Sequence, residues 1–334
     1  MKVRNKYNLE NIGIDVLHNK SRLFEKNKIL FLGVGGAGFN IIEKFVEMGY
    51  NGANLAFADT DYAAIATSKS PYKKELGEKV ANYKDTGNDI ELGKKACLES
   101  YDDLIELITP YKMVFMYAGL GGGLGSSAVI EIGKIAKKLD IFSLALVTTP
   151  FDFEINRKII SQKILTELRE NVDSYIVINN NFISDDNIQD KSMIDTFDFM
   201  NKKICDIGKS ICDLIIYYQN DNLTLHNFVG NTIDKGELFF DMRKSNSKGL
   251  DKGWSTLLFE KVIESLKIDD IAENTHKKGV MITIKYHSNF PADEIISLLG
   301  YFRDESNSLN DTLYGTIFDD EMKEDEIEII TIIQ

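Results

Sequence analysis

Apolar and polar positions in the first part of the chain predict a short buried strand followed by an amphipathic helix. Residues 1–27 are polar and mixed, with some helical periodicity. The apolar run Ile29–Leu32 that follows is typical of a buried strand, and apolar residues then recur at helical spacing over residues 41–46. Met48-Gly49 is a helix stop signal. The pattern therefore indicates a strand, a glycine-rich loop and a helix, in that order.

The rest of the first half repeats this alternation. Helix-like segments separate the strand-like ones, which is typical of an α/β domain whose sheet is mainly parallel. The further strand-like segments are residues 54–58, 113–117, 142–147 and 175–178.

Two glycine-rich loops come directly after predicted strands. The first reads GVGGAG (33–38) and the second reads GLGGGLGSSA (119–128). In a parallel sheet both lie beyond the carboxyl ends of strands, where helix starts expose backbone N–H groups. Glycine lets the backbone approach a phosphate closely and adopt positive φ. We therefore expect Gly121-Gly122-Gly123 to cradle phosphate oxygens, with Ser126 and Ser127 adding hydroxyl groups.

The first loop alone leaves two interpretations open. It suits a Rossmann dinucleotide site, for which Asp61 lies at a suitable distance as the ribose-binding acid, or it is simply a tight turn. The second loop decides against the Rossmann domain, because that fold has no use for a triple-glycine loop after its third strand.

Composition limits the class of protein. The chain has 334 residues, of which 43% are hydrophobic and 27% charged, enough for about two folded domains. The net charge of −13 disfavours nucleic acid as a partner. No apolar run approaches the roughly 20 residues of a membrane span and no signal-peptide core is present, so we expect a cytoplasmic protein. Three scattered cysteines argue against a disulfide framework or a metal site.

Six motifs in order resemble the tubulin/FtsZ superfamily, and its FtsZ branch in particular. GVGGAGFN (33–40) is similar to the first nucleotide loop of FtsZ, and ADTD (58–61) to the second. AGLGGGLGSS (118–127) is similar to the tubulin signature GGGTGS/TG, and VTTPFDFE (147–154) to the ribose-side loop. LRENVDSYIVINN (168–180) and ICDLI (211–215) follow in the expected order. The chain thus resembles a divergent FtsZ-like protein.

The resemblance implies an α/β fold with a parallel-sheet GTP-binding domain, joined by a long central helix to an α+β C-terminal domain. In that domain, residues 279–286 and the terminal segment EIEIITIIQ (326–334) are expected as strands of a mixed sheet. The implied division is an N-terminal extension over 1–27, the GTP-binding domain over 28–195, the central helix over 196–219 and the activation-type domain over 220–334.

The resemblance also implies a ligand, GTP or GDP, and assigns residues to it; Mg²⁺ as a companion ion stays open. Glu154 is expected to accept hydrogen bonds from the ribose, Phe197 to stack on guanine and Asn201 to pair with the guanine edge. Judged by itself, Phe197 also suits a core position, because Met200 and Ile204 continue a series of apolar residues spaced three or four positions apart. The full implied set is Gly35, Gly36, Asn40, Asp61, Gly119, Gly121, Gly122, Gly123, Leu124, Gly125, Ser126, Pro150, Glu154, Arg157 or Lys158 as the positive charge, Asn180, Phe197 and Asn201.

Two departures from the family pattern weaken the case for tight triphosphate binding. Leu124 stands where the tubulin signature has a threonine, so a hydroxyl group facing the phosphates is lost. The third loop, NYKDTGNDIELG (82–93), places Asp85 and Asp89 where their negative charges would lie near a γ-phosphate.

A third departure concerns hydrolysis. FtsZ and tubulin hydrolyse GTP when the next subunit inserts a loop whose acidic residues orient water, and in FtsZ that loop reads Asn-Leu-Asp-Phe-Ala-Asp. Counted from ICDLI, this chain has NLTLHN, Asn222 to Asn227, so Thr224 and Asn227 replace both acids. His226 is a weak alternative base, because a surface-loop histidine is more often simply solvated. We predict weak or absent GTP hydrolysis and no confident catalytic residue.

Two functions therefore stay open. The first is a guanine-nucleotide-binding cytoskeletal protein that assembles head to tail with itself into stable filaments, since a heterologous interface that does not close generates filaments. The second is a non-polymerising nucleotide-binding regulator or adaptor that pairs with another FtsZ-like protein or with a membrane or tether partner. The polar segment 1–27 is a candidate docking element or a packed extension.

Overall fold

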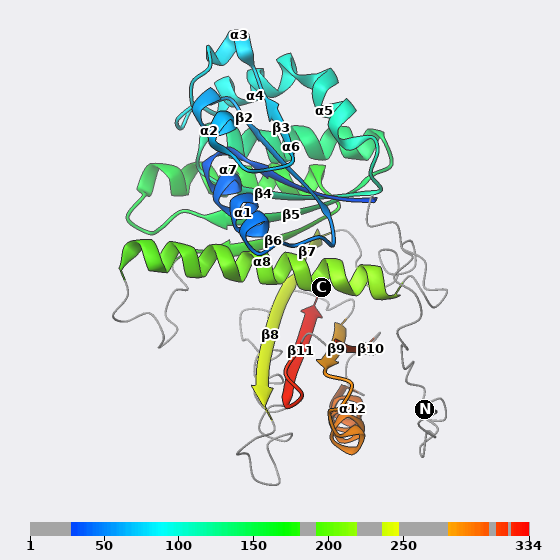
Figure 1. Cartoon of the computed structure of the whole chain (residues 1–334). Coiled ribbons are helices and arrows are strands. Elements are labelled where there is room, and N and C mark those ends of the chain that lie inside the picture. Colours follow the sequence, from blue (N-terminus) through cyan, green and yellow to red (C-terminus); the bar gives the residue numbers. More distant parts are fainter. Residues whose placement is uncertain are drawn as a thin grey trace. The chain divides into compact units, whose positions relative to one another are not determined.

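The computed structural model describes residues 28–180, 192–218, 236–246, 280–306, 312–319 and 322–333 (Figure 1). Contacts divide the chain into a larger unit, Glu25–Asp213 with Lys235–Glu237, and a smaller unit that holds the C-terminal sheet. The predicted N-terminal extension 1–27 and the loop 222–227 lie outside the described residues. The predicted domain boundaries stay predictions.

A parallel sheet forms the centre of the larger unit. The described residues contribute seven strands in the order β3-β2-β1-β4-β5-β6-β7, and every neighbouring pair is parallel. The expected α/β fold class is confirmed, although β3 and β7 have too few residues to stand out in the sequence. The strands are β1 (Ile29–Val34), β2 (Asn54–Asp59), β3 (Tyr72–Glu75), β4 (Met113–Gly119), β5 (Phe142–Thr149), β6 (Ser174–Asn179) and β7 (Gly236–Glu237).

The order of the strands reverses next to β1. The chain runs from β1 outward to β2 and β3, then returns to β4 on the other side of β1. Gly33 accordingly pairs with Phe57 on one side and with Tyr117 on the other. In open α/β sheets a ligand crevice forms at the carboxyl ends of the strands at such a switch point.

Helices cover both faces of this sheet (Figure 1). On one face, α5, α6 and α7 contribute Leu104, Ile132 and Leu168 to a core shared with Leu30 and Val114. The helices are α1 (Gly35–Glu47), α2 (Tyr62–Thr67), α3 (Glu78–Ala81), α4 (Ile90–Glu99), α5 (Tyr101–Ile108), α6 (Gly123–Lys138), α7 (Ile155–Asn171) and α8 (Met193–Tyr218).

An aromatic cluster fills the other face, beneath α1 and α8. The rings of Phe31 and Phe115 stack at 5.1 Å, and Phe45 of α1 and Tyr117 pack edge to face at 5.5 Å. All four side chains are fully buried. Burial of each side chain contributes about 2 kcal/mol, so this cluster fixes α1, and with it the first glycine loop, on the sheet.

The smaller unit contains a mixed sheet, as expected for the C-terminal domain. Among the described residues its strand order is β10-β9-β11-β8, with β10 parallel to β9 and β11 antiparallel to both β9 and β8. The predicted strands near residues 280 and 330 are confirmed. The elements are β8 (Phe239–Asn246), β9 (Val280–Tyr286), α12 (Ala292–Ser306), β10 (Thr312–Phe318) and β11 (Glu326–Ile333).

None of the helices in the described parts of the chain is both long and apolar enough to cross a membrane.

Candidate nucleotide-binding site

A cavity of about 480 Å³ lies at the carboxyl ends of the central strands. Its wall includes the last residues of three strands, Val34 of β1, Gly119 of β4 and Thr149 of β5, and Asn180 directly after β6. Ligand pockets in proteins usually measure about 300 to 1,000 Å³, so the cavity is large enough for a small organic molecule. Its position is the one that the reversed strand order predicts.

Three helices, α1, α6 and α7, begin in the wall of this cavity without a side-chain cap, and α1 and α6 do so at glycine-rich loops. No side chain caps α1 or α6 among the described residues, and neither helix has an acidic residue in its first turn. By contrast, Asp61 Oδ1 accepts the Ala63 N–H at 2.8 Å to cap α2, and Asp89 Oδ1 accepts the Leu92 N–H at 2.9 Å to cap α4. The partial positive charge at an uncapped helix start favours an anionic ligand.

Glycine keeps bare backbone in the wall at both helix starts. A Cβ atom at Gly36 would meet no atom within 4 Å, and one at Gly122 would meet only the Gly87 carbonyl oxygen at 3.9 Å. Both residues line the cavity, so a side chain there would occupy space in which a ligand can lie. This arrangement fits a group, such as a phosphate, that must approach the backbone closely.

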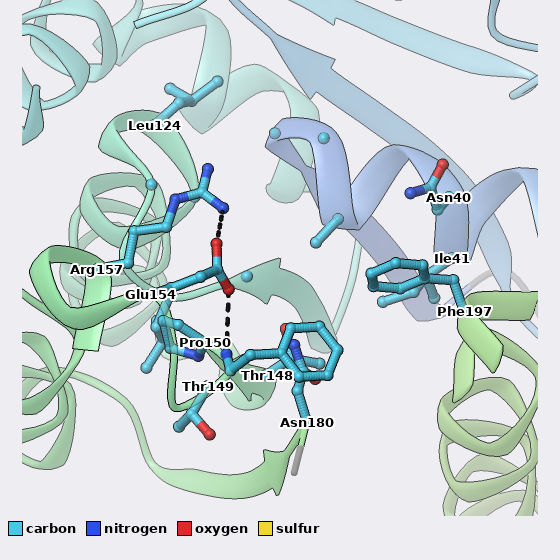
Figure 2. A pocket seen from close by; sticks show the side chains of 18 of the residues that line it. Asn40, Ile41, Leu124, Thr148, Thr149, Pro150, Glu154, Arg157, Asn180 and Phe197 are labelled. Carbon is cyan, nitrogen blue, oxygen red and sulfur yellow. Dashed lines mark hydrogen bonds and ion pairs between the residues drawn. The ribbon is translucent and has the colours of Figure 1, made fainter. Parts of the chain in front are cut away.

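Aromatic and amide side chains gather at the other end of the cavity. Phe197 of α8 lines it and is 42% exposed. Its ring packs edge to face on Phe151 at 5.7 Å, and Asn40 and Asn201 line the same cavity. In Figure 2, Phe197 and Asn40 lie on the opposite side from Arg157. A flat, polar-edged group such as a purine base matches this end.

An ion pair of α7 faces the cavity. Arg157 Nη1 donates to Glu154 Oε1 at 2.8 Å, and Glu154 Oε2 accepts the Phe151 N–H at 3.1 Å (Figure 2). Arg157 Nε also donates to Asn88 Oδ1 at 3.1 Å, which joins α7 to the loop before α4. The ion pair with Glu154 thus fixes the position of the Arg157 guanidinium group, and both side chains line the cavity.

Besides Glu154, two acidic residues place negative charge in or near the cavity wall. Asp85 lines the cavity directly. Asp59, at the end of β2, is 4% exposed, and burial raises the pKa of its carboxyl group from 3.8 to about 6. The neighbouring charges of Asp85 and Asp61 contribute a smaller part of this rise in pKa, while the N–H groups of Thr60 and Asp61 oppose it by donating hydrogen bonds to Asp59 Oδ1.

Comparisons with known proteins agree with this geometry. The family model "Tubulin/FtsZ family, GTPase domain" matches residues 28–187. The chain is 29% identical over 295 residues to the cell division protein FtsZ of Aquifex aeolicus, a match that covers 87% of this chain and 78% of that protein. It is 29% identical to FtsZ 2 of Rhizobium meliloti, which covers 87% of this chain and 83% of that protein. This chain is a divergent FtsZ-like member of the tubulin/FtsZ superfamily. It is a cytoskeletal protein with the family's GTPase domain.

Solved structures share the fold of this FtsZ-like protein. An empty FtsZ dimer of M. jannaschii matches with a TM-score of 0.77 at 21% identity, covering 92% of this chain and 88% of that one. CetZ2 of Haloferax volcanii, solved as a GTPγS-bound protofilament, matches with a TM-score of 0.71 at 15% identity, covering 92% of each chain. The expected tubulin/FtsZ fold is thereby confirmed.

Most of the residues that the FtsZ resemblance assigns to a nucleotide come together in the cavity wall. Segments that are far apart in the sequence, from the ends of β1, β4, β5 and β6 and from α7 and α8, supply them. The residues of the implied set that line the cavity are Gly35, Gly36, Asn40, Gly119, Gly122, Gly123, Leu124, Gly125, Pro150, Glu154, Arg157, Asn180, Phe197 and Asn201.

Four residues of the implied set, Asp61, Gly121, Ser126 and Lys158, are not in this wall. Asp61 caps α2, and Lys158 pairs with Asp152. Ser126 Oγ accepts the Gly121 N–H at 2.9 Å, and this bond braces the loop from inside. Asp89, which the sequence placed near a γ-phosphate, instead caps α4.

Sequence reasoning missed several wall residues. Phe151 and Phe153 both line the cavity, and their rings stack at 5.3 Å. The motif VTTPFDFE contained the signal, because two aromatic residues in a polar loop after a strand are seldom core positions. Leu120 and Thr148 were also missed, although they lie in the motifs AGLGGGLGSS and VTTPFDFE. Met200 and Ile204 were missed because their apolar helical spacing indicates core positions.

Proposed function

We propose that this FtsZ-like protein binds GTP or GDP in the cavity and assembles head to tail into filaments, with weak or absent GTP hydrolysis. The observation that carries the proposal is a glycine-lined cavity between two uncapped helix starts, in a chain whose interface loop reads NLTLHN. The first part of that observation supports nucleotide binding and the second supports poor turnover.

The assignment of the ligand's parts follows from the chemistry at the two ends. Bare backbone at Gly36 and Gly122, together with Arg157, suits a phosphate chain. Phe197 offers a face on which guanine stacks, and Asn201 offers an amide for its edge. Asn180 Oδ1 is buried without a hydrogen-bond partner among the described residues, so a ligand donor would satisfy it.

The metal ion stays a prediction. Within the described parts of the chain, no group of three or more His, Cys, Asp or Glu side chains gathers as metal ligands would. Mg²⁺ therefore enters the proposal only as a companion of the nucleotide phosphates.

Head-to-tail assembly is supported by the relatives and by the surface around the cavity. Structures with the same fold include a dimer and a protofilament. Beside the cavity, Phe153, Ile155 and Ile159 are 73%, 68% and 51% exposed. Large apolar side chains exposed together are typical of a face that another protein covers. We assign this face to the next copy of the chain.

Weak hydrolysis follows from the interface loop. The FtsZ resemblance places Thr224 and Asn227 where the acids that orient water would be, and neither side chain carries a negative charge at neutral pH. The loop lies outside the described residues, so this step rests on the sequence alone.

The test measures phosphate release and filament formation on one purified sample. We expect filaments with GTP by pelleting and negative-stain microscopy, with phosphate release well below that of an FtsZ that has both loop acids. Gly36→Trp is the binding-dead control, because a side chain there fills the cavity without meeting other atoms at its Cβ. Phosphate release at the rate of such an FtsZ would refute the hydrolysis part.

Two variants of the loop sharpen this test. Restoring both acids, Thr224→Asp with Asn227→Asp, is expected to raise phosphate release, whereas the neutral pair Thr224→Asn with Asn227→Gln is expected to leave it low. Nucleotide binding without filaments would instead favour the regulator or adaptor that pairs with another FtsZ-like or membrane protein.

A further inference from the structure

One edge of the larger unit combines exposed tyrosine rings with an apolar helix. Among the described strands β3 is the last of the parallel sheet on this side, and α2 and α3 flank it in the sequence. Tyr62 of α2 and Tyr83 after α3 are 57% and 46% exposed, and their rings pack edge to face at 6.4 Å. The helix α2, YAAIAT, has no charged side chain and no fully buried residue. This edge therefore leaves apolar surface in contact with solvent.

A strained backbone holds the Tyr83 ring in its exposed position. Asn82 and Tyr83 have φ values of 51° and 63°, in the left-handed region that is uncommon for residues other than glycine. The Tyr62 N–H donates to the Tyr83 carbonyl at 3.4 Å, and the Tyr83 hydroxyl donates to Glu78 Oε1. Strain at an exposed aromatic residue, outside the core, is typical of a surface that serves binding rather than stability.

Lysine side chains surround the two rings. Residues 69–84 include five lysines and two glutamates, in a chain whose net charge is −13. One of these lysines, Lys74, pairs with Asp103 of α5. The other four are exposed and make no ion pair with another described residue; they are Lys69, Lys73, Lys79 and Lys84. The edge is thus a local region of positive charge on an acidic protein.

The acidic side chains of this edge are held against the protein. Five of them accept hydrogen bonds from neighbouring groups: Glu43 from Ser68 and Lys69, Asp61 from Ala63, Glu78 from Tyr83, Asp85 from Gly87, and Glu99 from the N–H groups of Lys79 and Val80. Glu75 Oε1 is buried. The lysines are therefore the charges that an outside partner meets, and we call Tyr62, Lys69, Lys73, Lys79, Tyr83 and Lys84 the lysine–tyrosine surface.

We propose that the lysine–tyrosine surface docks directly on an anionic lipid membrane. Anionic headgroups attract lysines at the membrane surface, and tyrosine rings favour the boundary between headgroups and acyl chains. Composition favours lipid over a protein partner, because interfaces between proteins are depleted in lysine and alanine. Here alanine makes up half of α2, and lysines surround it. This interaction goes beyond the proposed nucleotide binding and does not require it.

The net negative charge of the chain does not prevent this contact. At an ionic strength of about 0.15 M the Debye length is about 8 Å, so charges on distant parts of the protein are largely screened from the membrane. Each lysine near an anionic membrane strengthens binding about fivefold, and four lysines act together here. Binding is therefore expected to disappear at high salt.

The experiment is flotation of the full chain with lipid vesicles, in the absence of nucleotide. Vesicles of phosphatidylcholine with about one third phosphatidylglycerol are expected to carry the chain at low salt, and vesicles of phosphatidylcholine alone are not. Lys73→Glu with Lys84→Glu is expected to lower the partition coefficient more than about tenfold, and Lys73→Arg with Lys84→Arg to preserve it. Lys69→Glu with Lys79→Glu tests the same surface independently, with the same expected loss.

A matched control separates the surface from the net charge. Lys137→Glu with Lys163→Glu makes the same change of charge at exposed positions of α6 and α7, and is expected to leave flotation nearly unchanged. An equal loss in this control would overturn the proposal.

Tyr83→Gly tests the ring without harming the fold. Glycine adopts the positive φ at this position freely, so the variant is expected to unfold at the same or a higher denaturant concentration. It is expected to bind anionic vesicles about threefold more weakly, because an interfacial ring is lost. Unchanged vesicle binding in this variant would overturn the role of the tyrosine.

The remaining outcomes also decide. Failure of the folded wild-type chain to float with anionic vesicles, or equal flotation with neutral ones, would overturn the proposal. Binding of polyglutamate instead of vesicles, lost in Lys73→Glu with Lys84→Glu, would assign the surface to an acidic protein. Gly36→Trp, the variant without nucleotide binding, is expected to float like the wild type, so failure of the proposed function and failure of this inference are distinguishable.

Discussion

Among the helices of the larger unit that begin near the cavity, α1 and α6 differ from α2 and α4 in whether a side chain caps the first turn. At α2 and α4, Asp61 and Asp89 place a carboxylate oxygen on a backbone N–H group. At α1 and α6 the corresponding positions are Val34 and Gly122, which provide no side-chain cap.

This difference separates structural from ligand-binding helix starts. A side-chain cap typically stabilises a helix by about 1 kcal/mol, so leaving two starts uncapped has a cost in stability. Both α1 and α6 begin in the cavity wall, where an anionic ligand can replace the missing carboxylate. Uncapped, glycine-rich helix starts in the cavity wall thus support the proposed phosphate end more specifically than glycine does alone.

The largest expected effect contrasts two glycines of the first loop. A Cβ atom at Gly38 would lie 2.6 Å from backbone atoms of Gly33 and Tyr117, whereas one at Gly36 would meet nothing within 4 Å. Gly38→Ala is therefore expected to lower the free energy of unfolding by about 3 kcal/mol or more. Gly36→Ala is expected to keep the fold and weaken nucleotide binding. Denaturant unfolding and nucleotide titration distinguish them, and equal destabilisation would refute this prediction.

The next prediction converts an open helix start into a capped one. Gly122 has φ −88° and ψ 159°, which suits a capping aspartate. Gly122→Asp is expected to change stability by only a few tenths of a kcal/mol while weakening GTP binding about 100-fold, because its charge and oxygen take the place of a phosphate. Gly122→Asn supplies the cap without the charge and should lose much less affinity. Unaltered GTP binding in the aspartate variant would contradict the proposed phosphate site.

A buried acid near the same edge predicts a pH effect. Because the pKa of Asp59 is raised from 3.8 to about 6 in the folded protein, the native state holds this proton more tightly than the unfolded chain does. The carboxyl group of Asp59 therefore does not change the free energy of unfolding below pH 3.8. It lowers that free energy increasingly as the pH rises toward 6, and lowers it by a constant amount above pH 6.

The matching variant is Asp59→Asn, which keeps an oxygen for the N–H groups of Thr60 and Asp61. It is expected to raise the free energy of unfolding at pH 7.5 by about 2 kcal/mol and to leave it unchanged at pH 4. Denaturant unfolding at several pH values measures this, with Glu106→Gln on the exposed face of α5 as a control. A gain that does not depend on pH would show that the charge is not the cause.

The smallest expected effect comes from removing the side-chain cap of α4. Asp89→Ala removes the α4 cap and is expected to lower the free energy of unfolding by about 1 kcal/mol, whereas Asp89→Asn, which can still cap, should lose little. Neither variant is expected to weaken GTP binding, because the Asp89 side chain bonds to Leu92 and does not line the cavity. Thermal unfolding with and without nucleotide measures both effects. Stronger GTP binding in Asp89→Ala would instead support the electrostatic role that the sequence suggested for this residue.

Much of the candidate site could be predicted from local patterns. The loops at residues 33–38 and 119–128 follow strong strand signals, and both line the cavity. The sequence did not decide whether Phe197 is a core residue or contacts the ligand. Apolar residues spaced three or four positions apart define one face of a helix, but they do not show whether that face lies against the core or lines a cavity. In the structure this residue is 42% exposed and lies against Phe151, which the sequence did not single out.

The sequence by itself determined the α/β class, five strands of the parallel sheet and the two glycine loops, because these depend on hydrophobic periodicity and on backbone freedom at single residues. Only the tertiary structure decided that Lys158 pairs with Asp152, that Asp89 caps α4 and that Asn88 contacts Arg157 across the sheet edge. Each of these outcomes is a choice among polar partners of similar chemistry, and it depends on distances between segments that no local pattern encodes.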